Sequence, residues 1–202
     1  MANSLITRRN VLLFTLTLLG GVATAYLVSP LIAEPEQPLM HKLGMGGDFT
    51  LQSVSGPTSL SEFKGKVSVL YIGYTHCPDV CPTSLAVMSQ ALEELSPEEL
   101  EQVQPSFVSV DPERDTPERL AEYGNFFHPK IIGMTGKKAE VDRMVDRYGA
   151  FYQKVEMKDS AMGYSVDHSS RIYLINKKGQ LSQTLTHATM PEEVAAEIRA
   201  LL

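Results

Sequence analysis

Hydrophobic positions first cluster in an uncharged run near the start of the 202-residue chain, from Val11 to Val28. This run is at the short end of the roughly 20 residues that a membrane-spanning helix needs. Arg8 and Arg9 precede it, and paired cations before a span favour the cytoplasmic side. We therefore predict a membrane anchor over residues 1–28, with the rest of the chain on the far side. A cleaved signal peptide is the alternative, because Ala23-Thr24-Ala25 resembles a small-x-small cleavage site.

Three prolines follow the apolar run, at positions 30, 35 and 38. Proline fixes the backbone and removes an N–H donor, so this stretch is typical of an extended spacer. We predict a proline-rich linker over residues 29–45 and one folded domain over residues 46–202, which is long enough for a well-buried core. The expected location is an inner membrane, with the anchored domain in the periplasm or an equivalent non-cytoplasmic compartment.

Beyond residue 45 the hydrophobic pattern alternates between strand and helix periods. Val67–Gly73 is a continuous apolar run, as expected for a central strand that is covered on both faces. Further strands are predicted over 49–54, 107–110, 131–134, 150–156, 171–175 and 181–186. Helices are predicted from 82 or 83 to about 95, from 97, over 117–127 and 139–148, and from 191. This order of elements predicts an α/β, thioredoxin-like three-layer domain with a central mixed sheet.

The two cysteines of the chain, Cys77 and Cys81, lie between the Val67–Gly73 strand and the next helix. The helix dipole favours the thiolate there, and the thiolate is the form that binds metal or attacks a disulfide. Cys81 precedes Pro82, which predicts that Cys81 caps the helix. Thioredoxin-type redox pairs have two residues between the cysteines, whereas three separate these. Two thiolates with one imidazole suit copper better than structural zinc, which wants four ligands, but spacing alone leaves a redox pair open.

Charge disfavours one class of partner. The chain carries a formal net charge of −6 at pH 7, and its sequence contains no basic stripe. This argues against nucleic acid as a main partner and suits a cation or a basic protein.

Three segments resemble the motifs of the Sco/SenC family of copper proteins, which assist the assembly of cytochrome c oxidase: Tyr71–Pro82, Asp111–Pro117 and Tyr164–Ser170. The resemblance implies that Cys77, Cys81 and His168 hold one copper ion, Cu(I) or Cu(II). It also implies that the two cysteines form a disulfide when oxidised. The implied partners are a respiratory oxidase subunit that carries a copper centre and a copper donor protein.

Charged side chains near these motifs are further candidates. Asp167 could orient the neighbouring His168 from outside the ligand set, or it is a turn residue. Asp111, Arg114 and Asp115 follow a strand that ends near the site, where they could shape the metal loop or only form a cap and ion pairs. Asp79 could tune charge or dock a partner, or it is an ordinary exposed acid of a loop.

Other soft donors have simpler interpretations. His76 adjoins Cys77 and could substitute as a ligand, but a surface role is favoured. Met157 and Met162 precede His168 and are expected to pack or remain exposed. The remaining histidines are expected to be solvated: His41, His128 and His187.

The leading functional hypothesis is a copper metallochaperone, not an enzyme, which delivers copper to a membrane respiratory oxidase. Copper loading would be gated by the thiol or disulfide state of Cys77 and Cys81. The alternative is a thiol-disulfide oxidoreductase that maintains the cysteines of the oxidase copper site. The segment Asp167–Ser170 lacks the proline that thioredoxin-like reductases place opposite their cysteines. A peroxiredoxin-type peroxidase is disfavoured, because Thr75 lies two residues before Cys77 and not three.

Overall fold

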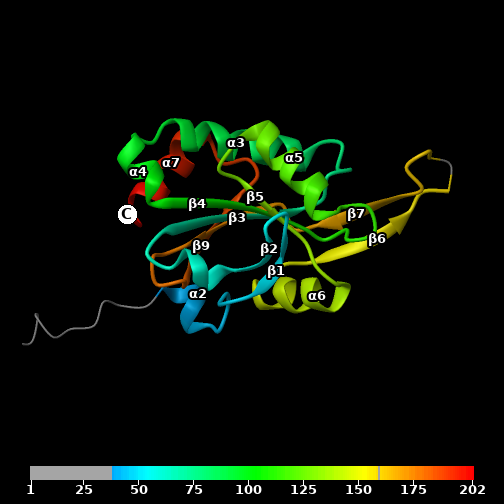
Figure 1. Ribbon diagram of the computed structural model, residues 1–202, viewed down its shortest axis with the longest axis horizontal. Helices are drawn as coiled ribbons and strands as arrows, with labels where there is room; N and C mark the ends of the chain where they lie inside the picture. Colours follow the sequence, from blue (N-terminus) through cyan, green and yellow to red (C-terminus); the bar gives the residue numbers. More distant parts are fainter. Residues whose placement is uncertain (1–37, 159) are drawn as a thin grey trace, which may run out of the picture. The chain divides into compact units, whose positions relative to one another are not determined.

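The computed structural model describes residues 38–158 and 160–202. They form a five-stranded sheet in the order β5-β4-β3-β8-β9 (Figure 1). The central strand β3 pairs in parallel with β4 and antiparallel with β8. β5 continues the parallel side, and β9 continues the antiparallel side. The sheet is therefore mixed, as predicted; its strands are β3 (Val67–Gly73), β4 (Val103–Ser109), β5 (Ile132–Met134), β8 (Arg171–Ile175) and β9 (Leu181–Thr186).

Helices cover both faces of the sheet, which gives the three layers expected. Figure 1 shows α3, α4, α5 and α7 on one face, and α2 and α6 on the other. Local signals start two of them: Ser96 forms a capping box with Glu99 before α4, and Thr116 accepts a hydrogen bond from the Arg119 N–H before α5. The helices are α2 (Leu39–Lys42), α3 (Val80–Glu93), α4 (Pro97–Glu101), α5 (Pro117–Phe127), α6 (Lys138–Arg147) and α7 (Pro191–Arg199).

The core lies along β3 and β4, in which all seven residues of each strand are buried. Full burial of a large apolar side chain contributes about 1.5–3 kcal/mol, so these two strands hold much of the stabilisation. β4 begins four residues before the predicted position 107, because Gln104 and Pro105 interrupt the apolar pattern. The Gln104 amide is satisfied in the interior, where it donates to the carbonyls of Pro105 and Lys130 at 2.9 and 3.1 Å.

Two hairpins stand outside the five-stranded sheet. The first joins β1 (Thr50–Ser53) to β2 (Gly56–Ser59) and leads into the 3₁₀ helix η1 (Leu60–Phe63). Gly56-Pro57 is typical of a turn in the sequence, but these residues belong to β2, and the chain turns at Val54 and Ser55.

The second hairpin joins β6 (Tyr152–Glu156) to β7 (Tyr164–His168). Figure 1 shows it projecting beyond the main sheet. The strands predicted from the sequence include β6 but not residues 164–168, whose polar composition is typical of a loop. These residues instead form β7, in which Ser165 and Asp167 alternate with inward-facing residues, of which only Val166 is fully buried.

The predicted anchor, residues 1–28, lies outside the described residues. Among residues 38–158 and 160–202, no helix has the length and hydrophobicity to cross a membrane. The described part of the predicted linker, from Pro38 to residue 45, includes α2, whose last turn carries His41 and Lys42.

Candidate metal centre

The two cysteines lie at the junction between β3 and α3. Cys77 is in the connecting loop and is partly buried, whereas Cys81 is in the first turn of α3 and fully buried. The prediction that Cys81 caps the helix is wrong, since the N-cap is Asp79 and α3 begins at Val80. Pro82, which follows Cys81, is tolerated in this first turn because the N–H groups there have no acceptor within the helix, so a proline removes no helical hydrogen bond.

His168, the last residue of β7, completes the cluster. Its Nε2 lies 3.2 Å from the Sγ of Cys81. The ring is edge-on to Tyr71 and Tyr74, with centroid distances of 6.3 and 5.7 Å. One ligand atom from each of Cys77, Cys81 and His168 lies within 4.8 Å of the other two. The structure therefore brings together all three predicted ligands.

Gly73 makes room for the buried sulfur. A Cβ at this position would lie 2.5 Å from the Sγ of Cys81, 3.1 Å from Tyr71 and 3.3 Å from Phe107. No carbon approaches a sulfur that closely without displacement, and the surrounding groups are packed in the core. The last residue of β3 is thus glycine because the thiol of Cys81 occupies the space of a side chain.

The two thiols differ in acidity. Hydrogen bonds from the thiol of Cys81, from His168 and from the backbone N–H groups of Asp79 and Cys81 lower the pKa of Cys77 to about 3, although burial opposes this. Burial, followed by the hydrogen bond and charge of Cys77, raises the pKa of Cys81 above the ordinary range. At neutral pH the pair holds one thiolate, which is stabilised by the remaining thiol.

A buried carboxylate fixes the loop that carries Cys77. Asp115 accepts hydrogen bonds from the backbone N–H and the hydroxyl of Thr75, at 2.9 and 2.5 Å, and from the hydroxyl of Ser109 at 2.5 Å. The Nε of Arg119 donates to the same Thr75 hydroxyl at 2.9 Å. These contacts support the first of the two roles weighed for Asp115 from the sequence, the shaping of the metal loop. The sequence does not show which groups Asp115 contacts.

The acidic candidates lie at different distances from the ligands. Asp167 is exposed on the outer side of β7, and the Nδ1 of His168 instead lies 3.3 Å from the carbonyl oxygen of Ser169. Asp79 is exposed and contributes its backbone N–H to Cys77. Asp111 is buried and contacts Arg114 and the Tyr164 hydroxyl, not a ligand.

The other histidines of the described residues do not belong to the donor cluster. The Nδ1 of His76 lies 3.2 Å from the Thr75 hydroxyl, and Met157 is exposed. His128 was expected to be solvated, which is wrong: it is buried, and its Nδ1 accepts a hydrogen bond from the Lys130 N–H at 3.2 Å. The three others have varied exposure: His187 is exposed, and His41 and Met162 are partly buried.

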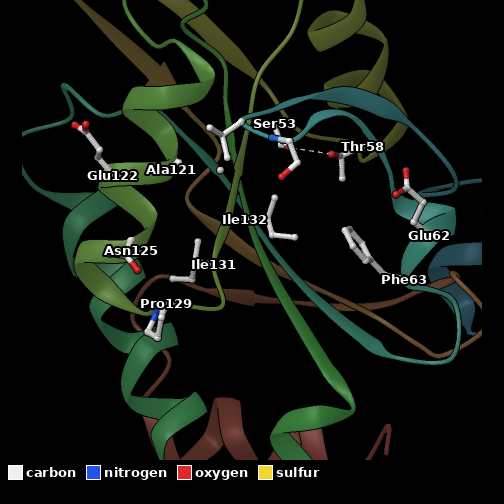
Figure 2. A pocket seen from close by; sticks show the side chains of 13 residues that line it. Ser53, Thr58, Glu62, Phe63, Ala121, Glu122, Asn125, Pro129, Ile131 and Ile132 are labelled. Carbon is white, nitrogen blue, oxygen red and sulfur yellow. Dashed lines mark hydrogen bonds between the residues drawn. The ribbon is translucent and has the colours of Figure 1, made fainter.

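A separate surface pocket of about 620 Å³ lies between the β1–β2 region and α5. Figure 2 shows Ser53 and Thr58, joined by a 2.8 Å hydrogen bond, across from Ala121 and Asn125 of α5. None of the three ligand residues lines this pocket. The cavity and the metal chemistry are thus in different places.

The donor set suits copper on chemical grounds. Two sulfurs and one imidazole nitrogen are soft to intermediate donors, which select copper and zinc over magnesium or calcium. Three ligands are few for structural zinc but suit copper, and they leave room for a further donor from another molecule. Within the described part of the chain, this is the one group of three or more Cys, His, Asp or Glu residues placed to hold a metal ion.

Comparisons with known proteins agree with this reading of the site. An SCO2-like protein of Rickettsia felis is 37% identical over 91% of this chain and 92% of its own length. The copper-bound structure of ScoI from Bradyrhizobium japonicum superposes with a TM-score of 0.70 at 37% identity, over 78% of this chain and 99% of that one.

A more distant structure, that of BsSco, supports the fold alone. It is 22% identical, with a TM-score of 0.62 over 84% of this chain and 98% of its own, and BsSco is described as a member of the Sco family of cytochrome c oxidase assembly proteins with a disulfide switch. The thioredoxin-like α/β fold is therefore confirmed. The family model SCO1/SenC matches residues 38–202. This chain belongs to the SCO1/SenC family.

Proposed function

We propose that this protein is a copper metallochaperone that carries one copper ion on Cys77, Cys81 and His168 and delivers it to a respiratory oxidase. The observation that carries the proposal is the convergence of these three donors, whose ligand atoms all lie within 4.8 Å of one another. A related ScoI has been solved with copper bound. Copper is the cargo in this function, so the protein is not an enzyme with respect to it.

The unequal exposure of the two cysteine residues supports transfer over permanent storage. Cys81 is fully buried, whereas Cys77 is partly exposed. A donor atom of a partner can therefore approach the ion beside Cys77 while Cys81 and His168 still hold it. The proposed partners are a copper donor protein and an oxidase subunit that carries a copper centre.

Thiol oxidation would gate loading. A disulfide between Cys77 and Cys81 removes both sulfur ligands, since the metal binds thiolates and not disulfides. Forming it releases two electrons and two protons in total, which a partner disulfide accepts when it is reduced to two thiols.

The proposed setting is a membrane surface. Residues 1–28 would anchor the chain, residues 29–45 would link it to the domain, and the domain from residue 46 would work in the periplasm or an equivalent compartment. The support is the uncharged run Val11–Val28 behind Arg8 and Arg9.

Copper stoichiometry and affinity test the proposal. The purified full chain, reduced and given copper, should bind about one equivalent. His168→Ala should bind more weakly by roughly 10-fold or more, because a ligand is lost. His187→Ala is the matched control, since this histidine is exposed and outside the cluster. Equal affinity of His168→Ala and the unaltered chain would contradict the three-ligand site.

A thiol-disulfide oxidoreductase is the second candidate. Cys77 favours it, because its pKa is lowered to about 3 and its side chain is partly exposed, as a nucleophilic thiolate requires. The residue before β8 is Ser170 and not the proline of thioredoxin-like reductases. Reduction of a partner disulfide without copper, and at the same rate in His168→Ala, would favour this candidate over the chaperone.

A further inference from the structure

The three ligands come from two parts of the fold that are built separately. Cys77 and Cys81 belong to the β3–α3 junction in the core of the main sheet. His168 belongs to the β6–β7 hairpin, which pairs only with itself. The position of the imidazole relative to the sulfurs therefore depends on what fastens this hairpin to the rest of the domain.

One inward-facing row of β7 makes that attachment. Residues two apart on a strand point to the same side, so Tyr164, Val166 and His168 share a face. Val166 is buried, and His168 reaches Cys81. Tyr164, at the other end of the row, donates its hydroxyl to Asp111 at 2.8 Å. The inward-facing row of β7 thus has His168 at one end and the hydrogen bond from Tyr164 to Asp111 at the other.

Arg114 is the centre of this second contact. Its Nε donates to the carboxylate of Asp111 at 2.5 Å, and its Nη1 donates to the carbonyl oxygens of Tyr164 at 3.1 Å and Met162 at 3.4 Å. Its guanidinium also lies over the Tyr164 ring, 3.6 Å from the centroid. The planar guanidinium can make these contacts together, whereas an ammonium group cannot.

The same guanidinium reaches toward the ligand through an aromatic ring. It lies 5.7 Å from the centroid of Tyr74, and Tyr74 contacts the ring of His168 edge-on at 5.7 Å between centroids. Arg114 therefore acts on His168 along two routes, through the β7 backbone and through Tyr74.

The Arg114–Asp111 pair that contacts the hairpin is more buried than the ion pair that Lys154 of the hairpin forms with Glu113 of the same loop. The side chains of Arg114 and Asp111 are 17% and 4% exposed. Those of Lys154 and Glu113, which pair at 3.0 Å, are 41% and 68% exposed. Solvent-exposed ion pairs contribute little, whereas a charge-assisted pair out of water holds its geometry firmly.

We propose that Arg114, held by Asp111, is a positioning residue for the copper ligand His168. It fixes the β6–β7 hairpin so that the imidazole lies against Cys81 before any metal arrives. The expected effect of Arg114 on copper binding rests on the proposed copper function. Its effect on the position of the His168 ring does not, since that position is a property of the fold and can be measured in the metal-free protein. The Asp111–Pro117 motif thereby serves the site by positioning a ligand, although none of its residues belongs to the proposed ligand set.

A double-mutant cycle on the full, reduced chain tests the consequence. Arg114→Ala should weaken copper binding by roughly 10- to 100-fold, the usual effect of removing a group that orients a ligand. The Cu(II) form of Arg114→Ala should also lose the imidazole nitrogen coupling in its electron paramagnetic resonance spectrum. The double variant with His168→Ala should bind copper no more weakly than His168→Ala alone. Additive losses would overturn the proposal.

A metal-free measurement tests the cause. In the unaltered chain the His168 ring protons should show nuclear magnetic resonance shifts from the rings of Tyr71 and Tyr74. Arg114→Ala should move these signals toward those of a solvated histidine. Tyr164→Phe, which loses only the hydroxyl contact with Asp111, should move them in the same direction by less. If Arg114→Ala does not fold, Tyr164→Phe still tests the positioning role.

Arg199→Ala is the matched control. Arg199 likewise joins separate elements, donating to the Glu94 carbonyl at 2.6 Å and pairing with Glu99, but it does not contact the hairpin. It should leave the His168 signals and copper affinity unchanged. Unshifted His168 signals in both Arg114→Ala and Tyr164→Phe would overturn the positioning role. Undiminished copper binding by His168→Ala would instead refute the three-ligand site, and the metal-free shifts would still decide the role of Arg114.

Discussion

The junction that carries the cysteines and the hairpin that carries the histidine are held in different ways. Cys81 lies in the core, in the first turn of α3, where its sulfur packs against the end of the fully buried strand β3. His168 ends a two-stranded hairpin in which one residue of β7, Val166, is fully buried. The sulfur ligands are therefore coupled to the stability of the whole domain. The nitrogen ligand is coupled mainly to a few polar and aromatic contacts.

Loss of Asp115 should have the largest effect and should fall on the cysteine side. Asp115→Ala leaves the Thr75 N–H and the Ser109 hydroxyl buried without their acceptor. We expect a loss of about 3 kcal/mol or more in the free energy of unfolding, because each such group costs about 1–3 kcal/mol. Chemical denaturation measures it. Asp142→Ala, which removes a more exposed carboxylate of α6, should cost much less; similar losses would contradict the assignment.

Gly73→Ala should come next, with an effect on stability and copper together. The new Cβ would meet the Sγ of Cys81 at 2.5 Å, and overpacking a core typically costs about 1–3 kcal/mol. The displaced sulfur should also bind copper more weakly.

Gly133→Ala separates the two effects of the Gly73 change. Its Cβ would lie 2.5 Å from the backbone oxygen of Leu120, an equal approach in a place away from the ligands. Gly133→Ala should lower the melting temperature but leave the affinity of the folded protein for copper unchanged. A loss of copper affinity in this variant as well would show that the sulfur site is sensitive to any core strain.

The thiolate of Cys77 links the two regions, because His168 helps to stabilise it. The pKa of Cys77 is lowered to about 3, against about 8.5 in an unfolded chain. The stabilisation of the fold by this thiolate is therefore complete above about pH 8.5 and is lost as the pH falls toward the folded pKa.

Alkylation of the metal-free protein follows this charge. Cys77 should react with iodoacetamide even at about pH 5, where an ordinary thiol is protonated, and buried Cys81 should not. His168→Ala should raise the pKa of Cys77, since a hydrogen bond to the thiolate is lost. Mass spectrometry identifies the modified cysteine. A reaction that begins only near pH 8 would contradict the shift.

The smallest effect should come from loss of the exposed ion pair between Lys154 of the hairpin and Glu113. Lys154→Ala breaks the ion pair with Glu113, and such pairs contribute about 0–1 kcal/mol. Unfolding free energy and copper affinity should both stay close to those of the unaltered chain. A copper defect as large as that of Arg114→Ala would show that the hairpin is held by surface charge and not by the buried pair.

The sequence predicts the core side of this comparison better than the hairpin side. The bounds of β3 and β8 follow from largely apolar runs, and the start of β9 follows from the turn at 176–179 that precedes it. The β7 strand does not, because a hairpin that rests on one buried residue has no clear period. The sequence also predicts the start of α3 too late, at 82 or 83 and not at Val80. A residue before proline disfavours the helical conformation, but Cys81 adopts it because the first turn of a helix needs no N–H from Pro82.

The site was predictable as a set of ligands but not as a structure. The motif resemblance implies Cys77, Cys81 and His168 as the proposed ligands, and the structure brings their donor atoms together. The roles of Asp115 and Arg114 depend on contacts across 40 and 50 positions of the chain. Patterns within a few residues carry no signal for such contacts.

The void kept open by Gly73 has a consequence for how the protein can change. Because the thiol of Cys81 fills the place of a missing side chain, the strand end and the sulfur are a single packed unit. A homologue that gains even a methyl group at this position should be found only with an altered residue, or a shifted backbone, at the position of Cys81. Covariation between these two positions would record that mutual dependence.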